Sequence, residues 1–229
     1  MNSPNNRQLR VAAFEPRSLV NGPGVRAVLW VQGCGRRCPG CFNPDFLPRA
    51  GGRDVPVQEA IQWIQSAAAV HHPTIHSSTH PQLPSARLEG VTFSGGEPFD
   101  QAAALAEVAR AVRAMGLGVL IFTGHPWEDL ERSADSGHRA LLEAADLLVA
   151  GPYQRDNPPI QQSTHPAIHC PPPHPLLSSA NQELVFLTER YRNTDFGRRR
   201  RAEYRIGADG TVRSSGFPYP VARIPEPNQ

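Results

Sequence analysis

The chain has 229 residues, a formal charge of +2 at neutral pH and 39% hydrophobic residues. This length and composition suit one globular domain over residues 1–229 and exclude a largely disordered chain. A near-neutral charge argues against a nucleic-acid partner bound through a basic face. No run of about 18 apolar residues is present and the start lacks a signal-peptide core, so we expect a cytoplasmic protein without a membrane partner.

The first two thirds of the chain predict alternating strands and helices. Runs of β-branched and large apolar residues predict buried strands, and apolar residues at helical spacing predict the helices that follow them. The predicted strands are 26–32, 90–94, 118–123 and 147–150. The predicted helices begin at an Asp54 cap, at an Asp100 cap, near Pro126 and at His138.

This alternation predicts parallel strands joined by right-handed crossovers, and therefore an α/β sheet or partial barrel. Ligands of such folds gather at the carboxyl ends of the strands. Four loops follow the predicted strands there: the cysteine loop, SGGEP, TGH and GPY. We expect these four loops to converge on one site.

Two segments interrupt the pattern, 71–87 and 154–175, and both are crowded with Pro, His, Ser and Thr. We interpret them as surface insertions into a core that runs from about residue 11 to 190. In the C-terminal extension, 191–229, the pair Asp209-Gly210 lies between alternating residues. It predicts a small β-hairpin over 203–213.

Three of the four cysteines, Cys34, Cys38 and Cys41, lie in the loop after the first predicted strand. Three thiolates from one short loop are ligands suited to an iron–sulfur cluster, and they leave one of four irons open for another molecule. Zinc is the alternative. A structural zinc site needs four ligands, and Cys170 or a histidine of the insertions could supply the fourth.

The cysteine spacing and its neighbouring motifs resemble the radical S-adenosylmethionine enzymes. Within them the sequence is most similar to the activating enzymes of glycyl radical enzymes, in particular the anaerobic ribonucleotide reductase activating proteins. The motifs are NGPGVR (21–26), VQGC (31–34), CPGCFNP (38–44), SGGEP (94–98), FTG (122–124), GPY (151–153) and SANQ (179–182).

The resemblance implies a single domain with an open partial (β/α) barrel of the radical S-adenosylmethionine type, completed by the small C-terminal hairpin. It implies a 4Fe-4S cluster ligated by Cys34, Cys38 and Cys41, and S-adenosylmethionine chelated at the open iron. It further implies an oxidoreductase that cleaves S-adenosylmethionine to a 5′-deoxyadenosyl radical, which takes a hydrogen atom from a backbone glycine of a partner enzyme. A one-electron donor such as flavodoxin or ferredoxin would reduce the cluster.

The resemblance also assigns contacts to S-adenosylmethionine. It places the SGGEP loop at the methionine amino group, the residues around the last cysteine at the adenine end, and the loop after the third strand at a further contact. The residues so assigned are Gly95, Gly96, Glu97, Gly40, Cys41, Phe42, Thr123 and Gly124.

Two positions depart from the activating enzymes. These usually carry an acidic residue where this chain has Ala150, and a glycine where it has Ser178. The departures leave open a radical enzyme that acts on another peptide or on a small molecule. A metal-binding or electron-transfer module without catalysis is a third possibility, against which the intact SGGEP loop argues.

Overall fold

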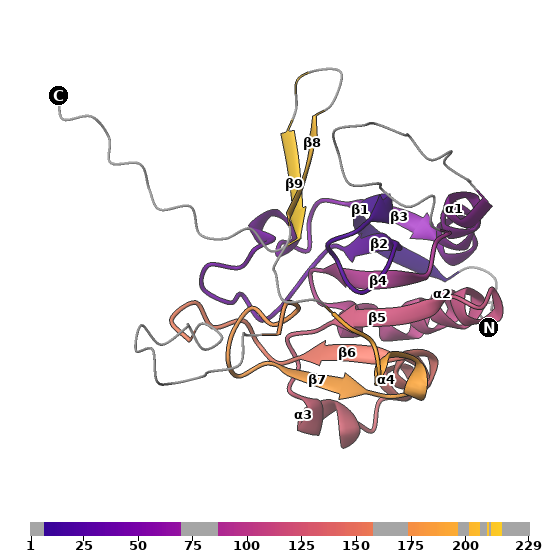
Figure 1. Cartoon of the computed structure of the whole chain (residues 1–229). Coiled ribbons are helices and arrows are strands. Elements are labelled where there is room, and N and C mark those ends of the chain that lie inside the picture. The colour runs from indigo at the N-terminus through magenta and orange to yellow at the C-terminus, as the bar shows by residue number, and fades with distance from the viewer. Residues whose placement is uncertain are drawn as a thin grey trace.

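A computed structural model gives the structure of the chain (Figure 1). It describes residues 7–69, 87–157, 174–196, 202–206, 210 and 212–216. Its centre is a seven-stranded sheet with the strand order β3-β1-β2-β4-β5-β6-β7. Four neighbouring strands in the middle run parallel: β2 (Arg26–Val31), β4 (Gly90–Gly95), β5 (Gly118–Phe122) and β6 (Leu147–Ala150). The four predicted strands are therefore confirmed.

Three antiparallel strands extend the sheet beyond this parallel centre. Strand β1 (Gln8–Ser18) pairs with β2, β3 (Arg53–Pro56) pairs with β1, and β7 (Glu183–Phe186) pairs with β6. The two end strands, β3 and β7, are not neighbours in the sheet. The fold is an open α/β sheet and not a closed barrel, as predicted.

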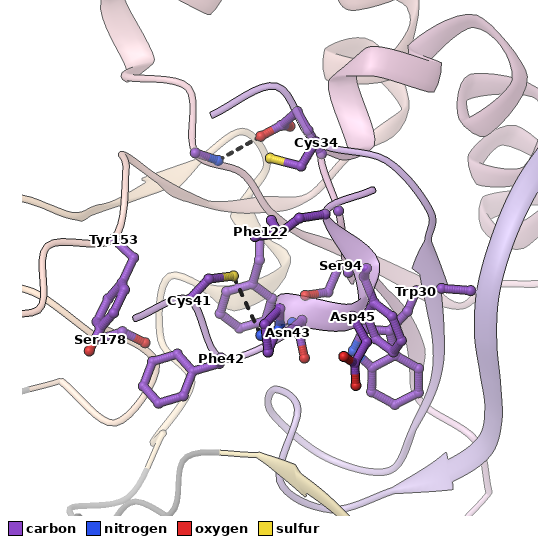
Figure 2. Close-up of a pocket in the computed structure, with 18 of the residues that line it drawn as sticks. Trp30, Cys34, Cys41, Phe42, Asn43, Asp45, Ser94, Phe122, Tyr153 and Ser178 are labelled. Carbon is purple, nitrogen blue, oxygen red and sulfur yellow. Dashed lines mark hydrogen bonds between the residues drawn. The ribbon is translucent and has the colours of Figure 1, made fainter. Parts of the chain in front are cut away.

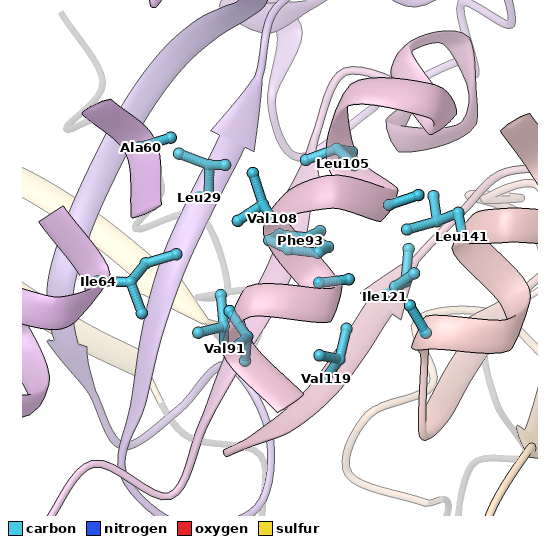
Figure 3. Packing of buried hydrophobic residues seen from close by; sticks show 14 of the residues in the cluster. Leu29, Ala60, Ile64, Val91, Phe93, Leu105, Val108, Val119, Ile121 and Leu141 are labelled. Carbon is cyan, nitrogen blue, oxygen red and sulfur yellow. The ribbon is translucent and has the colours of Figure 1, made fainter. Parts of the chain in front are cut away.

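The helices α1 (Val57–Ala69), α2 (Ala102–Ala114) and α4 (Ser136–Ala144) cover one face of the sheet, and the short α3 (Trp127–Glu131) precedes α4. Figure 3 shows the core between sheet and helices, formed by residues such as Leu29, Phe93 and Ile121 from neighbouring strands. Asp135 caps α4 by accepting hydrogen bonds from the backbone N–H groups of Gly137 and His138, at 2.7 and 3.0 Å, so this helix begins slightly before its predicted start.

Two predicted helix caps are wrong. Asp54 lies in β3, where the Arg10 guanidinium on the paired strand β1 binds its carboxylate at 3.0 Å. Asp100 lies inside a short 3-10 helix, η3 (Pro98–Gln101), whose cap is Glu97. The two errors have different causes: Asp54 pairs with Arg10, which is distant in the sequence, whereas Asp100 lies within a 3-10 turn that begins three residues earlier, at Glu97.

On the other face of the sheet, a second buried cluster combines Leu120, Leu147 and Val149 with Leu176 and Tyr191 from the later part of the chain. Successive residues of a strand point to opposite faces, so the strands that supply the helix-covered core also supply this face. We call it the inner face. It ends in a cavity at the carboxyl ends of the parallel strands.

The predicted C-terminal hairpin is confirmed as β8 (Ala202–Ile206) paired antiparallel with β9 (Val212–Gly216), somewhat longer than expected. Most of the two predicted insertions, and Cys170 with them, lies outside the described residues. Two further short 3-10 helices are η2 (Pro44–Phe46) and η4 (Glu189–Tyr191). Within the described part of the chain, no helix is both long and apolar enough to cross a membrane.

Candidate functional site

The four loops that follow the parallel strands meet around one cavity of about 680 Å³, part of which is shown in Figure 2. Their predicted convergence is confirmed. Nine of the ten residues singled out from the sequence line this cavity, with Gly40 as the exception. The nine are Cys34, Cys38, Cys41, Phe42, Gly95, Gly96, Glu97, Thr123 and Gly124.

The cysteine loop is folded by backbone hydrogen bonds to the segment around η2. Gly33 and Cys34 donate to the carbonyls of Phe46 and Leu47, at 2.8 and 3.0 Å, and Cys41 donates to the carbonyl of Cys38 at 3.1 Å. All three cysteines are half-buried and free of disulfide bonds. The loop therefore presents three reduced thiols to one cavity.

The surroundings of these thiols act on their charge in two directions. Burial raises the pKa of Cys34 and of Cys41, because it disfavours the thiolate. Backbone N–H groups oppose this: those of Arg36 and Arg37 reach the Cys34 sulfur, and that of Asn43 donates to the Cys41 sulfur at 3.4 Å. Such N–H donors stabilise a sulfur that carries charge, as it does when bound to iron.

These residues fit an iron–sulfur cluster. Among the described residues no three His, Cys, Asp or Glu side chains are grouped so as to hold a single metal ion. A cluster does not need that, because each cysteine binds a different iron. The open cavity beside the loop leaves room for a molecule at the iron that lacks a cysteine. Cys170, the suggested fourth ligand of a zinc site, lies outside the described residues.

Glu97 holds two of the loops together. Only 2% of it is exposed, and its Oε1 accepts hydrogen bonds from Phe99 N–H at 3.0 Å and from the Thr123 hydroxyl at 2.7 Å. Its Oε2 accepts from Gly124 N–H at 2.8 Å and lies 3.9 Å from Nε of Arg36. Burial raises the pKa of this carboxyl, and the three hydrogen bonds and the Arg36 charge oppose that shift.

This network limits what the predicted contacts offer a ligand. The Thr123 hydroxyl and the Gly124 N–H already donate hydrogen bonds to Glu97. Both lone pairs of Glu97 Oε1 are also occupied, by Phe99 N–H and by the Thr123 hydroxyl. The acceptor position still open is on Oε2, on the side of Arg36. Contact between Glu97 and the methionine amino group stays a prediction, and Oε2 is the oxygen that could make it.

Arg36 lies between the first two cysteines and lines the cavity, although sequence reasoning gave it no role. Its Nε is buried and has no hydrogen-bond partner within the described residues. Burial also lowers the pKa of His125, and the nearby Arg36 charge adds to that effect. Arg36 therefore brings a positive charge to the end of the cavity that also holds the Glu97 carboxylate.

Aromatic side chains form another wall. Phe42 contacts Tyr153 of the GPY motif, with ring centroids 4.9 Å apart, and Trp30 and Phe122 line the cavity from the strands (Figure 2). Gly40 has a φ of +71°, a left-handed backbone conformation that favours glycine, and it lies close to the exposed guanidinium of Arg155. Gly40 is thus needed for the shape of the loop.

The late motif SANQ ties two loops together. The Asn181 amide donates to the carbonyl of Pro152 at 2.7 Å, and the Gln182 amide donates to that of Gly151 at 3.1 Å. The Gln182 side-chain oxygen accepts from Ser178 N–H at 2.8 Å. The motif therefore fixes the GPY loop, a role that the sequence did not reveal.

Sequence reasoning also missed two parts of the cavity wall. One is strand β1, which was not predicted and contributes Ala12, Ala13, Phe14 and Glu15. The other is the C-terminal hairpin, which contributes Glu203, Ser214, Ser215 and Gly216. The hairpin itself was predicted, but no pattern in the sequence indicated where it would lie.

Three free cysteines that line one cavity, at the carboxyl ends of the parallel strands of an α/β sheet, indicate an iron–sulfur protein. The chain belongs to the family of 4Fe-4S single cluster domains, whose model matches residues 20–167. The predicted cluster is confirmed by this family.

Curated relatives support the resemblance to activating enzymes. The chain is 33% identical over 141 residues to the pyruvate formate-lyase-activating enzyme of Clostridium pasteurianum, covering 61% of this chain and 50% of that one. It is 26% identical over 177 residues to the anaerobic ribonucleoside-triphosphate reductase-activating protein of Vibrio cholerae, covering 75% of this chain and 94% of that one. The chain thus spans about half the length of its pyruvate formate-lyase-activating relatives.

One solved structure, that of QueE from Escherichia coli, matches 62% of this chain and 70% of its own. The TM-score is 0.37 and the sequence identity is 13%. A likeness this remote carries no functional argument.

Proposed function

We propose that this chain is a radical S-adenosylmethionine enzyme that generates a glycyl radical on a partner enzyme. The observation that supports this best is that one cavity contains both the three free cysteines and the SGGEP loop. A structural metal site would not require an open cavity beside its ligands. A cluster with one iron left for a second molecule does require an open cavity beside its ligands.

The residues divide the work by position. Cys34, Cys38 and Cys41 would hold the cluster, which when bound supplies the electron that cleaves S-adenosylmethionine to a 5′-deoxyadenosyl radical. Arg36 offers a cation to a carboxylate, and Glu97 Oε2 offers an acceptor to an amino group. These two charges lie side by side, as the carboxylate and amino groups of a methionine do.

The aromatic wall and the buried loops serve the same chemistry by excluding water from a reactive species. Phe42, Tyr153, Trp30 and Phe122 give one side of the cavity an apolar surface. Such a surface suits the adenosine part of the molecule by stacking and by area burial. S-adenosylmethionine is therefore the cosubstrate that we propose.

The proposed partner is anaerobic ribonucleoside-triphosphate reductase. The match to the reductase-activating protein covers 94% of that relative, whereas the matches to pyruvate formate-lyase-activating enzymes cover about half of theirs. The higher identity to the latter, 33% against 26%, is confined to the shared part. The match that extends over nearly the whole relative therefore favours the reductase.

A second candidate is a radical enzyme that acts on another peptide or on a small molecule. Two observations favour it: Ala150, at the end of β6, is fully buried and replaces the usual acidic residue, and Ser178 lines the cavity where a glycine is usual. Both lie beside the loops expected to meet the substrate. They leave the cysteine loop unchanged.

The test compares anaerobically reconstituted wild type with Cys38→Ala and Cys170→Ala. We expect the wild type and Cys170→Ala to bind iron and sulfide and to release 5′-deoxyadenosine with dithionite and S-adenosylmethionine. Cys38→Ala should do neither. Metal lost in Cys170→Ala as well would favour a four-ligand zinc site and contradict the proposal.

The partner is tested in a second step, by adding purified anaerobic ribonucleoside-triphosphate reductase and recording its electron paramagnetic resonance spectrum. A glycyl radical doublet that depends on wild-type chain supports the reductase as partner. Release of 5′-deoxyadenosine without any doublet would favour the second candidate.

A further inference from the structure

The segment that joins the second and third cysteines of the loop is a tight turn. Cys41 N–H donates to the carbonyl of Cys38 at 3.1 Å, which closes a four-residue turn with Pro39 and Gly40 at its centre. Gly40 has a φ of +71°. Proline at the second position and a left-handed glycine at the third are typical of a type II β-turn. The first and last residues of this turn are the two cysteines.

This turn brings the two cysteines to the spacing of a disulfide bond. The Cα atoms at the two ends of a β-turn lie less than about 7 Å apart, and those of disulfide-bonded cysteines usually lie about 4.4–6.8 Å apart. The side chains of Cys38 and Cys41 are half-buried and line the same cavity, so a small molecule can reach both. The turn therefore meets the requirements of a bond between them.

Cys34 is placed differently from the other two cysteines. The backbone N–H groups of Arg36 and Arg37 reach its sulfur, and within the described residues no backbone hydrogen bond closes a turn between Cys34 and Cys38. Figure 2 shows the Cys34 and Cys41 side chains at separate places of the cavity wall. The backbone thus pairs Cys38 with Cys41 and leaves Cys34 outside the pair.

We propose that the turn over 38–41 is a redox switch: in the protein without its cluster, Cys38 and Cys41 form a reversible disulfide bond, which prevents cluster binding until a thiol reduces it. The inference goes beyond the proposed function, because the bond needs no S-adenosylmethionine chemistry. Once these two sulfur atoms are joined, Cys34 is the one cysteine of the loop left to bind iron. A cluster held by three cysteines cannot then form.

The oxidant in this step is a small-molecule disulfide, such as oxidised glutathione. The thiolate of one cysteine attacks a glutathione sulfur and releases one reduced glutathione, and the second cysteine then attacks the mixed disulfide and releases the other. Each protein thiol loses a proton and each released glutathione gains one, so atoms and electrons balance. The product is recoverable by thiols, whereas a cysteine oxidised to sulfinic acid is not. The bond therefore also protects two cluster ligands.

The test equilibrates the full chain, freed of metal and reduced, with mixtures of reduced and oxidised glutathione under anaerobic conditions. Free thiols are then blocked by alkylation, and the chain is cut with trypsin after its arginines. The sequence suits this measurement, because residues 27–36 carry Cys34 and residues 38–49 carry both Cys38 and Cys41. We expect peptide 38–49 to escape alkylation and to be lighter by two hydrogen atoms in mass spectra as the mixture becomes more oxidising.

Two cysteine variants assign the bond. Cys34→Ser is the matched control, because it removes a cysteine of the same loop that lies outside the turn, and it should form the disulfide as the wild type does. Cys38→Ser should instead retain one glutathione on Cys41, because no second thiol of the turn is present to displace it.

Two glycine variants test whether the turn favours the bond. Gly40→Ala disfavours the left-handed turn, which the dithiol form can leave and the disulfide form needs, so the equilibrium constant for disulfide formation should fall about 5- to 30-fold. Gly35→Ala is the control in the same loop. Gly35 has open space around it and no positive φ, and its substitution should change the constant by less than about 2-fold.

Iron uptake tests the switch itself. During brief anaerobic reconstitution without added thiol, the oxidised wild type should initially bind iron and sulfide no faster than Cys38→Ser does. Treatment with dithiothreitol should restore the uptake of the reduced wild type. Equal initial uptake by oxidised and reduced wild type would overturn the switch.

Other results would overturn the disulfide. These are a glutathione adduct that persists on peptide 38–49, a bond from that peptide to 27–36 or to Cys170, and equal equilibrium constants for Gly40→Ala and Gly35→Ala. The proposed function fails on a different observation, namely no 5′-deoxyadenosine from fully reduced and reconstituted wild type.

Discussion

The two faces of the sheet come from the same strands and have opposite characters. On the helix-covered face, Leu29, Phe93 and Ile121 are fully buried among other apolar side chains. On the inner face, the residues next to two of them along the chain, Trp30 and Phe122, line the cavity. Strand alternation thus places stability on one side of each strand and chemistry on the other.

The helix-covered face is held by apolar packing, whereas the inner face combines a smaller apolar cluster with a network of buried hydrogen bonds. Arg26 is completely buried there, at the start of β2, and its guanidinium donates to Thr92, to Tyr191 and to backbone carbonyls that include Val91 at 2.6 Å and Gly118 at 3.2 Å. Hydrogen bonds such as these can hold a buried surface in place beside an open cavity, because they do not require side chains to fill all of the space around them. The comparison predicts that substitutions on the two faces have different effects.

The largest effect on stability is expected on the helix-covered face. Phe93→Ala should lower the free energy of unfolding by about 3–5 kcal/mol, because it leaves a void between β4 and the helices. Phe122→Ala, on the inner face at the cavity, should cost clearly less, because its ring already borders open space. Chemical denaturation of both variants measures the difference, and equal losses would contradict the division between the faces.

A smaller loss is expected from the hydrogen-bonded part of the inner face. Arg26→Met keeps much of the apolar stem and removes every donor, so that the Thr92 and Tyr191 hydroxyls and the carbonyls lose their partner. We expect a loss of at least about 2 kcal/mol in the free energy of unfolding. Arg113→Met is the control, because Arg113 donates at the surface to the carbonyl of Glu143 and should change stability by less than about 0.5 kcal/mol.

If Arg26→Met proved as stable as the control, the inner face would owe its stability to packing after all. Replacing buried polar groups by apolar ones is neutral in some proteins, so the outcome discriminates. Here the partners of Arg26 are neutral, and within the described residues no carboxylate pairs with it. Removing the guanidinium therefore leaves the acceptor hydroxyls and carbonyls without a donor, and no buried negative charge is left unpaired by the change.

The sequence predicted the parallel half of the fold because each strand there is a short apolar run bounded by turn residues. Strand β1 escaped prediction because Pro16 and two irregularities in its pairing break the alternation that identifies a strand. Strand β3 is four residues long and ends in Pro56, and β7 is equally short. These strands are defined by their neighbours in the sheet more than by their own residues.

The candidate site divides in the same way. The cysteines and the SGGEP loop are contiguous motifs, and sequence spacing was enough to indicate them. The positions of Arg36 and Glu203 in the cavity wall depend on contacts between segments far apart in the sequence, such as the hydrogen bond from Leu19 N–H to Glu203, which no local pattern encodes. Sequence could also not show that Glu97 uses its carboxylate to join two loops, since its partners Thr123 and Gly124 lie more than twenty residues away.

The smallest expected effect is on the pH dependence of stability, and it comes from Glu97 in the loop after β4. Burial raises the pKa of Glu97 above its ordinary value of 4.5. The folded state therefore holds this proton more tightly than the unfolded state does. The stability that this contributes is fully present below the ordinary pKa, and it is lost as the pH rises through the raised pKa.

Glu97→Gln removes this titration. The amide has no proton to lose, so the variant should not show the decline that the wild type shows above pH 4.5. The difference in unfolding free energy between wild type and variant should therefore shift against the wild type as the pH rises. Denaturation curves of the metal-free proteins at a series of pH values measure it, without a contribution from cluster loss. Parallel pH profiles would contradict this prediction, because they would mean that the three hydrogen bonds and Arg36 offset the burial of the carboxylate in full.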